Sequence, residues 1–142
     1  MDQDEMETKK EEMSLMANLD QCHESCLEGM IHSLDEGGDF AKTDHIRWLL
    51  DCAEICQIAG NFAIRQSEYA GDMLSTCAFI CDDCAESCET FSNDEHMKNC
   101  AQICRNCAGV CRDTIEEEET DEELEDYLEE DKQEKGEGEQ IK

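Results

Sequence analysis

The sequence contains no proline, and aromatic residues make up only 5% of its 142 residues. The first residues, MDQDEMETKKEEM, do not combine a basic start with an apolar run, so we expect no secretory signal peptide. No stretch approaches the ~20 apolar residues that cross a bilayer. Basic residues are scarce, with 11 Lys and Arg against 39 Asp and Glu. This imbalance argues against nucleic acid or an anionic membrane surface as a partner.

Cysteine is what the sequence has in excess, with 12 residues among 142. In a small secreted protein, this density is typical of a scaffold held together by disulfides. Since we expect no signal peptide, we place the thiols in a reducing cytoplasm, where cysteine patterns more often bind metal. The composition therefore favours a cytoplasmic metal-binding protein.

Four segments with helical periodicity are separated by short stretches of turn-forming residues. Two glycines at 37–38 end the first segment, Thr43 and Asp44 are typical N-cap residues, and Ser-Asn-Asp-Glu at 92–95 precedes the fourth. No segment alternates with period two, so no strand is expected. Short connections between four helices predict an all-α, antiparallel up-down-up-down four-helix bundle. The predicted helices span residues 12–35, 43–66, 68–91 and 95–117.

The two ends of the chain are polar and are expected to lie outside the bundle. Residues 1–12 are predicted to be flexible, and residues 13–117 to form one domain, the cysteine-lined bundle. Residues 116–142 carry 15 acidic side chains and three lysines, a net charge of −12. We expect residues 118–142 to be an acidic, mostly disordered tail that begins as a continuation of the last helix and promotes solubility. Adaptation to salt and a cationic partner are the alternatives.

The cysteines fall at helical spacing in each predicted helix. Residues 77–88 read CAFICDDCAESC and residues 100–111 read CAQICRNCAGVC, with cysteine at the same four places. At about 100° per residue, the four thiols of each run fall within a wedge about 60° wide. The pairs Cys22/Cys26 and Cys52/Cys56 use the same four-residue step on the first two helices. Every helix therefore carries a cysteine stripe where a bundle normally places leucine.

Two interpretations of these stripes compete. Cysteine can act as a small core hydrophobe, but twelve thiols facing one another would leave a thin core, because cysteine is much smaller than leucine. Alternatively, the core is filled by metal. Soft thiolates select copper(I), zinc or iron–sulfur clusters, and a sulfur atom can bridge two soft ions. The second interpretation predicts a line of copper(I) sites along the bundle axis.

The runs CAFICDDCAESC and CAQICRNCAGVC, together with CAEIC at 52–56, resemble the four-helix-bundle, cysteine-rich copper storage proteins. The resemblance covers roughly residues 14–115. It implies a lumen that binds many copper(I) ions through cysteine thiolates, a homo-oligomer that is a tetramer of bundles, and a cytosolic type without an export signal. We expect about one ion per thiolate, or about twelve. The predicted ligands are Cys22, Cys26, Cys52, Cys56, Cys77, Cys81, Cys84, Cys88, Cys100, Cys104, Cys107 and Cys111, with His45, His96 and Met30.

Met30, His45 and His96 are included because each lies near the cysteine stripe of its helix. In an up-down-up-down bundle the end of helix one and the starts of helices two and four meet, so these side chains should converge there. We expect copper to reach the thiolates from this end, as the resemblance also implies. The angles place Met97 about 20° outside the wedge. His23 is expected at the surface, and the position of His32 near the rim is ambiguous.

The opposite end of the stripes is predicted to be an apolar plug. Met73, four residues before Cys77, is a possible ligand there. The residues of this predicted plug are Leu15, Leu19, Ala59, Ala63, Leu74 and Ile115.

Three other functions stay open at this point. A disulfide-linked or redox hairpin protein could pair Cys22/Cys26 with Cys52/Cys56, although the four-thiol stripes fit it less well. An iron–sulfur carrier usually takes its cysteines from loops and has a proline after the last ligand. Structural zinc would take four thiolates per ion, giving about three ions. Twelve equivalent thiols give no reason to single out a nucleophile, so we do not expect an enzyme.

Overall fold

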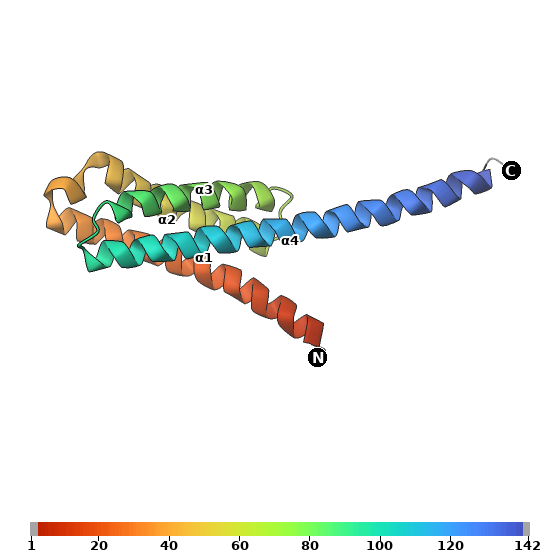
Figure 1. Cartoon of the computed structure of the whole chain (residues 1–142), viewed down its shortest axis with the longest axis horizontal. Helices are drawn as coiled ribbons and strands as arrows, with labels where there is room; N and C mark the ends of the chain where they lie inside the picture. The colour runs from red at the N-terminus through yellow and green to blue at the C-terminus, as the bar shows by residue number, and fades with distance from the viewer. Residues whose placement is uncertain (1–2, 141–142) are drawn as a thin grey trace.

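The computed structural model describes the backbone of residues 3–140 and the side chains of residues 15–120, 124, 128 and 129. It contains four α-helices and one short 3-10 helix (Figure 1). Residues 3–140 form no strand, in agreement with the predicted all-α class. The elements are α1 (Gln3–Glu36), η1 (Gly38–Ala41), α2 (Thr43–Ile64), α3 (Ala70–Glu89) and α4 (Glu95–Gln140).

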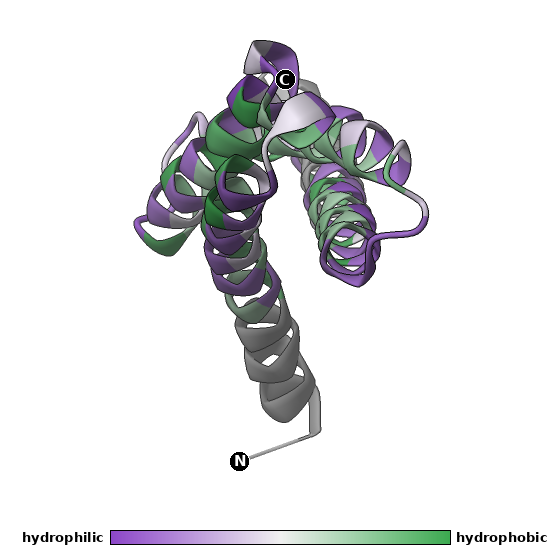
Figure 2. Cartoon of the chain, turned by 90° about the vertical axis from the view of Figure 1, so that its left-hand side faces the viewer, coloured by the Kyte–Doolittle hydropathy of each residue, from purple (hydrophilic) through white to green (hydrophobic). Residues whose placement is uncertain are grey.

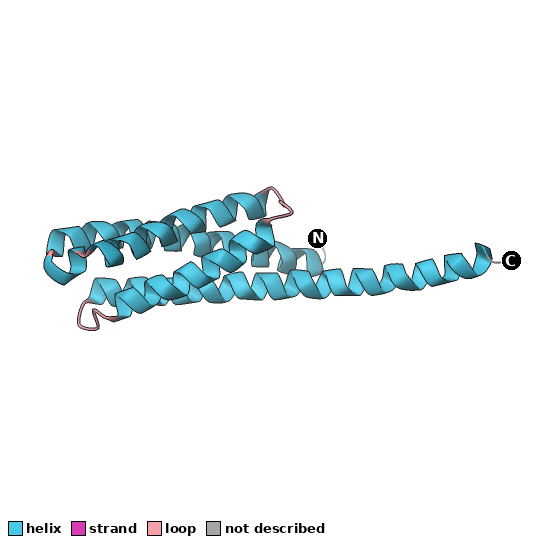
Figure 3. Ribbon diagram, turned by 90° about the horizontal axis from the view of Figure 1, so that it is seen from above, coloured by secondary structure: helices cyan, strands magenta, loops and turns pink. Residues whose placement is uncertain are grey.

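The helices form an antiparallel four-helix bundle, as predicted. α1 packs against α2 and α4, and α3 packs against the same two helices, so α1 and α3 occupy opposite corners (Figures 1 and 3). The α1–α2 and α3–α4 connections lie at one end of the bundle, on the left in Figure 1. We call this end the mouth. The α2–α3 connection lies at the other end. The first part of α1 and the last part of α4 extend beyond the bundle from this end.

Local signals explain where the helices stop. Gly37 and Gly38 follow α1 with φ values of 72° and 55°, a left-handed conformation in which glycine is favoured. The Asp94 carboxylate accepts the backbone N–H of Met97 at 2.9 Å and thereby caps the start of α4. The predicted cap at 92–95 is therefore correct. α2 begins at Thr43, one residue earlier than a Thr43 cap would place it.

The two outer helices run further than predicted. α1 begins at Gln3 instead of residue 12, and α4 continues to Gln140 instead of ending near residue 117. Beyond Ile115, the described side chains are exposed, and α4 leaves the bundle as a single helix (Figure 1). Glutamate is a good helix former, so the α4 pattern has no breaker at the point where packing ends. The flexibility of residues 1–12 and 118–142 stays a prediction.

The core lies along the axis of the bundle and consists mainly of cysteine. All twelve cysteine side chains are at most 1% exposed, and the large side chains buried with them are Leu19, Leu49, Leu74 and Met97. Viewed from the mouth, each helix carries both hydrophilic and hydrophobic residues, as amphipathic helices do (Figure 2). Alanines that follow cysteines, such as Ala53 and Ala85, are also buried and allow close helix packing. Among the described residues, no helix is both long and apolar enough to span a membrane.

Candidate metal-binding lumen

The twelve predicted cysteine ligands bring their sulfur atoms together on the bundle axis. Between neighbouring helices, the Sγ atoms of Cys52 and Cys81 lie 3.6 Å apart, and those of Cys26 and Cys104 lie 3.7 Å apart. Sulfur atoms also meet across the diagonals of the bundle. Cys22 on α1 lies 3.9 Å from Cys81 on α3, and Cys52 on α2 lies 4.0 Å from Cys104 on α4. The centre of the bundle is therefore a packed column of sulfur.

Within this column, three groups of four cysteines have all their Sγ atoms within 4.8 Å of one another. Consecutive groups share members, so they form a continuous row and not three separate sites. The groups are Cys22/Cys26/Cys52/Cys104, Cys22/Cys52/Cys56/Cys81 and Cys56/Cys77/Cys81/Cys107. Each group draws on at least three helices, which means that the tertiary fold assembles each of them.

The other four cysteines extend the column toward both ends. Cys84, Cys88 and Cys100 lie toward the mouth, and all three side chains are buried. The Cys100 Sγ also lies 3.8 Å from the backbone oxygen of Ser25. Cys111 lies toward the opposite end and is also buried. The predicted cysteine stripes are thus buried along their whole length on all four helices.

All twelve cysteines are free thiols. Sulfur atoms separated by 3.6–4.0 Å are in van der Waals and weak hydrogen-bond contact, whereas a disulfide requires about 2.05 Å. The disulfide-scaffold alternative therefore has no support among these residues.

The thiols are acid–base coupled through their contacts. The pKa of Cys104 is raised, first by the neighbouring Cys100 thiol and further by burial. The pKa of Cys22 is lowered, first through its contact with the Cys104 thiol, whose Sγ lies 3.8 Å away. A thiol that holds a proton thus stabilises a thiolate beside it. Since soft metals bind the thiolate, an ion that enters this network must displace the remaining protons.

At the mouth, His45 is buried and both of its ring nitrogens have serine partners. Since the thioether of Met97 can only accept, the Ser33 hydroxyl donates to its Sδ at 3.8 Å. Ser33 then accepts the Nε2–H of His45 at 3.2 Å, and Ser87 donates to Nδ1 at 2.8 Å. Burial lowers the pKa of His45, so the ring is neutral at pH 7. To bind metal through Nδ1, His45 must release Ser87.

His96 and Met30 are half-buried, and their surroundings differ from those of His45. The ring of His96 contacts that of His32, with 4.6 Å between centroids. The Nε2 atom of His32 lies 3.0 Å from the Asp94 carboxylate. The ambiguous His32 is therefore part of the rim. His23 is not simply a surface residue, because it is half-buried and its Nδ1 lies 2.6 Å from the Ala53 carbonyl oxygen.

Met97 lies at the mouth but was not among the ligands predicted from the sequence. It is fully buried, although the angles placed it outside the wedge. A Cβ atom added to Gly29 would lie 3.3 Å from Met97 Cε and 3.6 Å from Cys100 Sγ. Gly29 on α1 therefore leaves space for the Met97 thioether beside Cys100, the cysteine of α4 that lies nearest the mouth.

The opposite end is apolar, as predicted. Leu15, Leu19, Ala59 and Leu74 are buried beyond the last sulfur atoms. Ala63, Ile115 and Met73 are half-buried and pack against this layer. The column of thiols is therefore sealed by hydrocarbon at this end, while its other end lies beneath polar side chains.

Residues 8–116 match the family model described as copper storage protein. This match covers more than half of the chain and the entire cysteine column. The chain belongs to the copper storage protein family. A search of curated protein sequences found no match.

Solved structures show the same bundle. The crystal structure of the Nmul_A1745 protein from Nitrosospira multiformis is 35% identical, with a TM-score of 0.69, and the match covers 75% of this chain and 96% of that one. The Cu(I)-bound copper storage protein BsCsp3 is 25% identical, with a TM-score of 0.68 and coverage of 72% and 96%. Apo-Csp3 from Bacillus subtilis, at 24% identity and a TM-score of 0.64, shares the fold over the same proportions.

Proposed function

We propose that this protein stores copper(I) as a row of thiolate-bound ions inside the bundle. The observation that carries the proposal is the overlap of the three buried four-cysteine groups. Thiolates are soft ligands that favour copper(I), and burial keeps water away from the bound ions. A solved relative at 25% identity is described as Cu(I)-bound, which supports the same cargo here.

The sharing of cysteines between groups favours copper(I) over structural zinc. A closed tetrahedral zinc site takes four thiolates for one ion. Here Cys22, Cys52, Cys56 and Cys81 each belong to two groups, so the three groups together contain only eight different cysteines. Three zinc ions would therefore have to share thiolates. Bridging thiolates with few ligands per ion suit copper(I), and about twelve ions would match the twelve thiols.

Anaerobic titration with copper(I) against a competing chelator tests this function. We expect about twelve ions per chain, bound tightly enough to remove copper from the chelator until the thiols are used. A matched zinc titration should saturate near three ions or fewer. Saturation by copper(I) at about three ions, or no competition with the chelator, would contradict storage in the sulfur column.

We also propose that copper reaches the column from the mouth, with Met30, His45 and His96 as ligands on the way. The opposite end is closed by four buried apolar side chains, whereas the mouth carries imidazole and thioether groups. The double variant His45→Ala, His96→Ala should take up copper more slowly with the same final capacity. An unchanged uptake rate with unchanged capacity would remove these histidines from the path and leave the storage proposal standing.

Three further parts of the proposal concern the setting of the protein. We place it in a reducing cytoplasm, because free thiols this close together would be expected to oxidise elsewhere. We propose a homo-oligomer, since Ile31, Leu34 and Ile58 are large apolar residues exposed on α1 and α2. We propose sequestration without catalysis, because the sulfur column offers equivalent ligands and no distinct nucleophile. Thiol counting on freshly purified protein tests the reducing location, and light scattering tests the homo-oligomer.

A further inference from the structure

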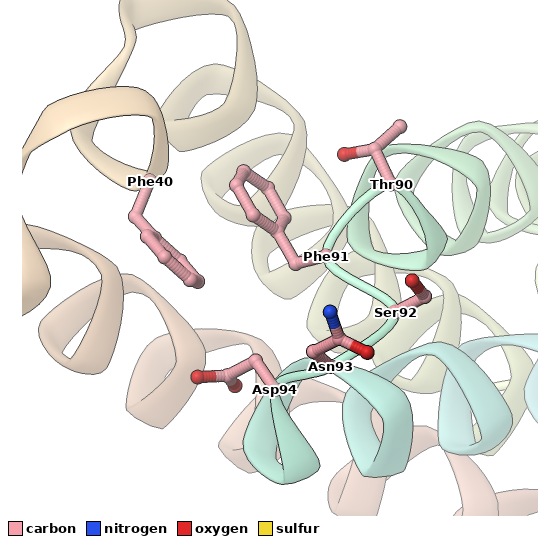
Figure 4. Close-up of a pocket in the computed structure, with 6 residues that line it drawn as sticks. All are labelled: Phe40, Thr90, Phe91, Ser92, Asn93 and Asp94. Atoms are coloured by element: carbon pink, nitrogen blue, oxygen red, sulfur yellow. The ribbon is translucent and has the colours of Figure 1, made fainter.

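The two connections at the mouth are joined by an aromatic stack. Phe40 lies in η1, between α1 and α2, and Phe91 lies in the connection between α3 and α4. Their ring centroids are 4.2 Å apart and the planes differ by 19°. Figure 4 shows the two rings between the connections, beside a cavity of about 330 Å³ that Phe40 and residues 90–94 line. The stack therefore links the two halves of the mouth.

The stack also covers the polar groups that lie above the sulfur column. The ring of Phe91 lies on that of His45, with 4.8 Å between centroids. The ring of Phe40 meets the edge of His32 at 6.0 Å. Met97 and Cys100, which lie deeper, are at most 1% exposed. The two rings therefore lie on the outer side of His45 and His32, while Met97 and Cys100 are buried beneath this end.

The segment that carries Phe40 has no fully buried residue, and Phe40 itself packs against the core only partly buried. η1 has four residues, and none of them is buried. Gly37 and Gly38, on its α1 side, both have positive φ values, and a Cβ atom on either would meet nothing within 4 Å. The glycines are thus suited to the backbone conformation rather than to a tight contact. Few buried contacts and a glycine hinge are typical of a segment that opens locally.

We propose that the Phe40–Phe91 stack is a lid over the mouth, and that η1 must swing away from Phe91 before copper(I) can enter or leave. This inference rests on the proposed copper storage function and adds the step that controls exchange. Breaking the stack exposes the imidazole of His45 and opens the way to Met97 and Cys100. The lid sets the rate of exchange, whereas the twelve thiols set the capacity.

Copper(I) removal from the fully loaded protein by a saturating chelator tests the lid. At high chelator concentration the removal rate reaches a plateau that reports opening of the protein. Phe40→Ala removes one ring of the stack from a segment without buried residues. Phe91→Leu keeps an apolar side chain over His45 but cannot stack. Both variants should keep the wild-type copper capacity and raise the plateau rate about two- to tenfold, the factor expected from one aromatic pair.

Phe79→Ala is the matched control, because Phe79 is exposed on α3 and contacts Arg112 away from the mouth. Its plateau rate should equal that of the wild type. Wild-type plateau rates in both lid variants, with full capacity, would overturn the lid and leave storage intact. The same acceleration in Phe79→Ala would overturn it as well, since the effect would then be general loosening. A wild-type protein that binds no copper(I) would overturn both the lid and the proposed function.

Discussion

A sulfur atom in the middle of the column should hold more copper than one outside the shared groups. Cys81 and Cys84 lie on α3, and both side chains are fully buried. The Sγ of Cys81 lies 3.6 Å from Cys52 and 3.8 Å from Cys56, and Cys81 belongs to two of the three groups. Cys84 belongs to none of them. We therefore expect Cys81→Ala to lose about two copper ions and Cys84→Ala about one.

The two substitutions should have the same effect on the stability of the copper-free protein. Each removes one buried sulfur, a group near the size of a methylene, and should cost about 1 kcal/mol of unfolding free energy. The difference in capacity thus reflects the metal sites and not the fold. Anaerobic chelator competition gives the capacity, and urea unfolding of the apo variants checks that their stabilities agree. Equal copper losses, or a larger loss from Cys84→Ala, would refute the reasoning from shared groups.

Copper loading should raise the melting temperature by at least roughly 10 °C in anaerobic calorimetry, because one site filled at 100 times its Kd adds about 2.7 kcal/mol; equal values would contradict a metal-filled core. Burial lowers the pKa of His45 below its ordinary 6.5, so at lower pH the unfolded chain binds a proton that the folded protein excludes. Apo stability should therefore fall as pH drops below 6.5, and less so in His45→Gln, as followed by urea unfolding at several pH values. Leu19→Ala in the apolar end should cost about 2–5 kcal/mol of apo stability and leave copper capacity unchanged; a lost ion would mean that this end binds metal.

The cysteine column could be predicted from the sequence because one rule decides it. Steps of three and four residues keep all the thiols of a helix on one face, and a bundle turns that face inward. The structure buries Cys77, Cys88, Cys100 and Cys111, the ends of the two long runs, as completely as their neighbours. The apolar closure by Leu19 and Leu74 follows from the same rule. The start of α1 and the end of α4 could not be predicted in this way, because both lie beyond the packed part of the bundle.

The mouth was less predictable, because its groups are arranged by contacts between different helices. By angle, His96 and Met97 lie about equally far from the centre of the α4 stripe, on opposite flanks. The structure buries Met97 because Gly29 on α1 leaves space for it. The partners of His45, Ser33 and Ser87, come from α1 and α3 and have no spacing signal. Phe40 and Phe91 lie in connections, where helical periodicity predicts nothing.

Because sulfur takes the place that leucine holds in other bundles, the atoms that pack the interior of this protein are also the ligands of its cargo. A molecule that has lost its copper has lost the bonds that tie these sulfur atoms together, so its backbone should open more often and be cut sooner by proteases. Copper occupancy should therefore set the lifetime of each molecule, with copper-loaded protein degraded slowly and copper-free protein degraded first.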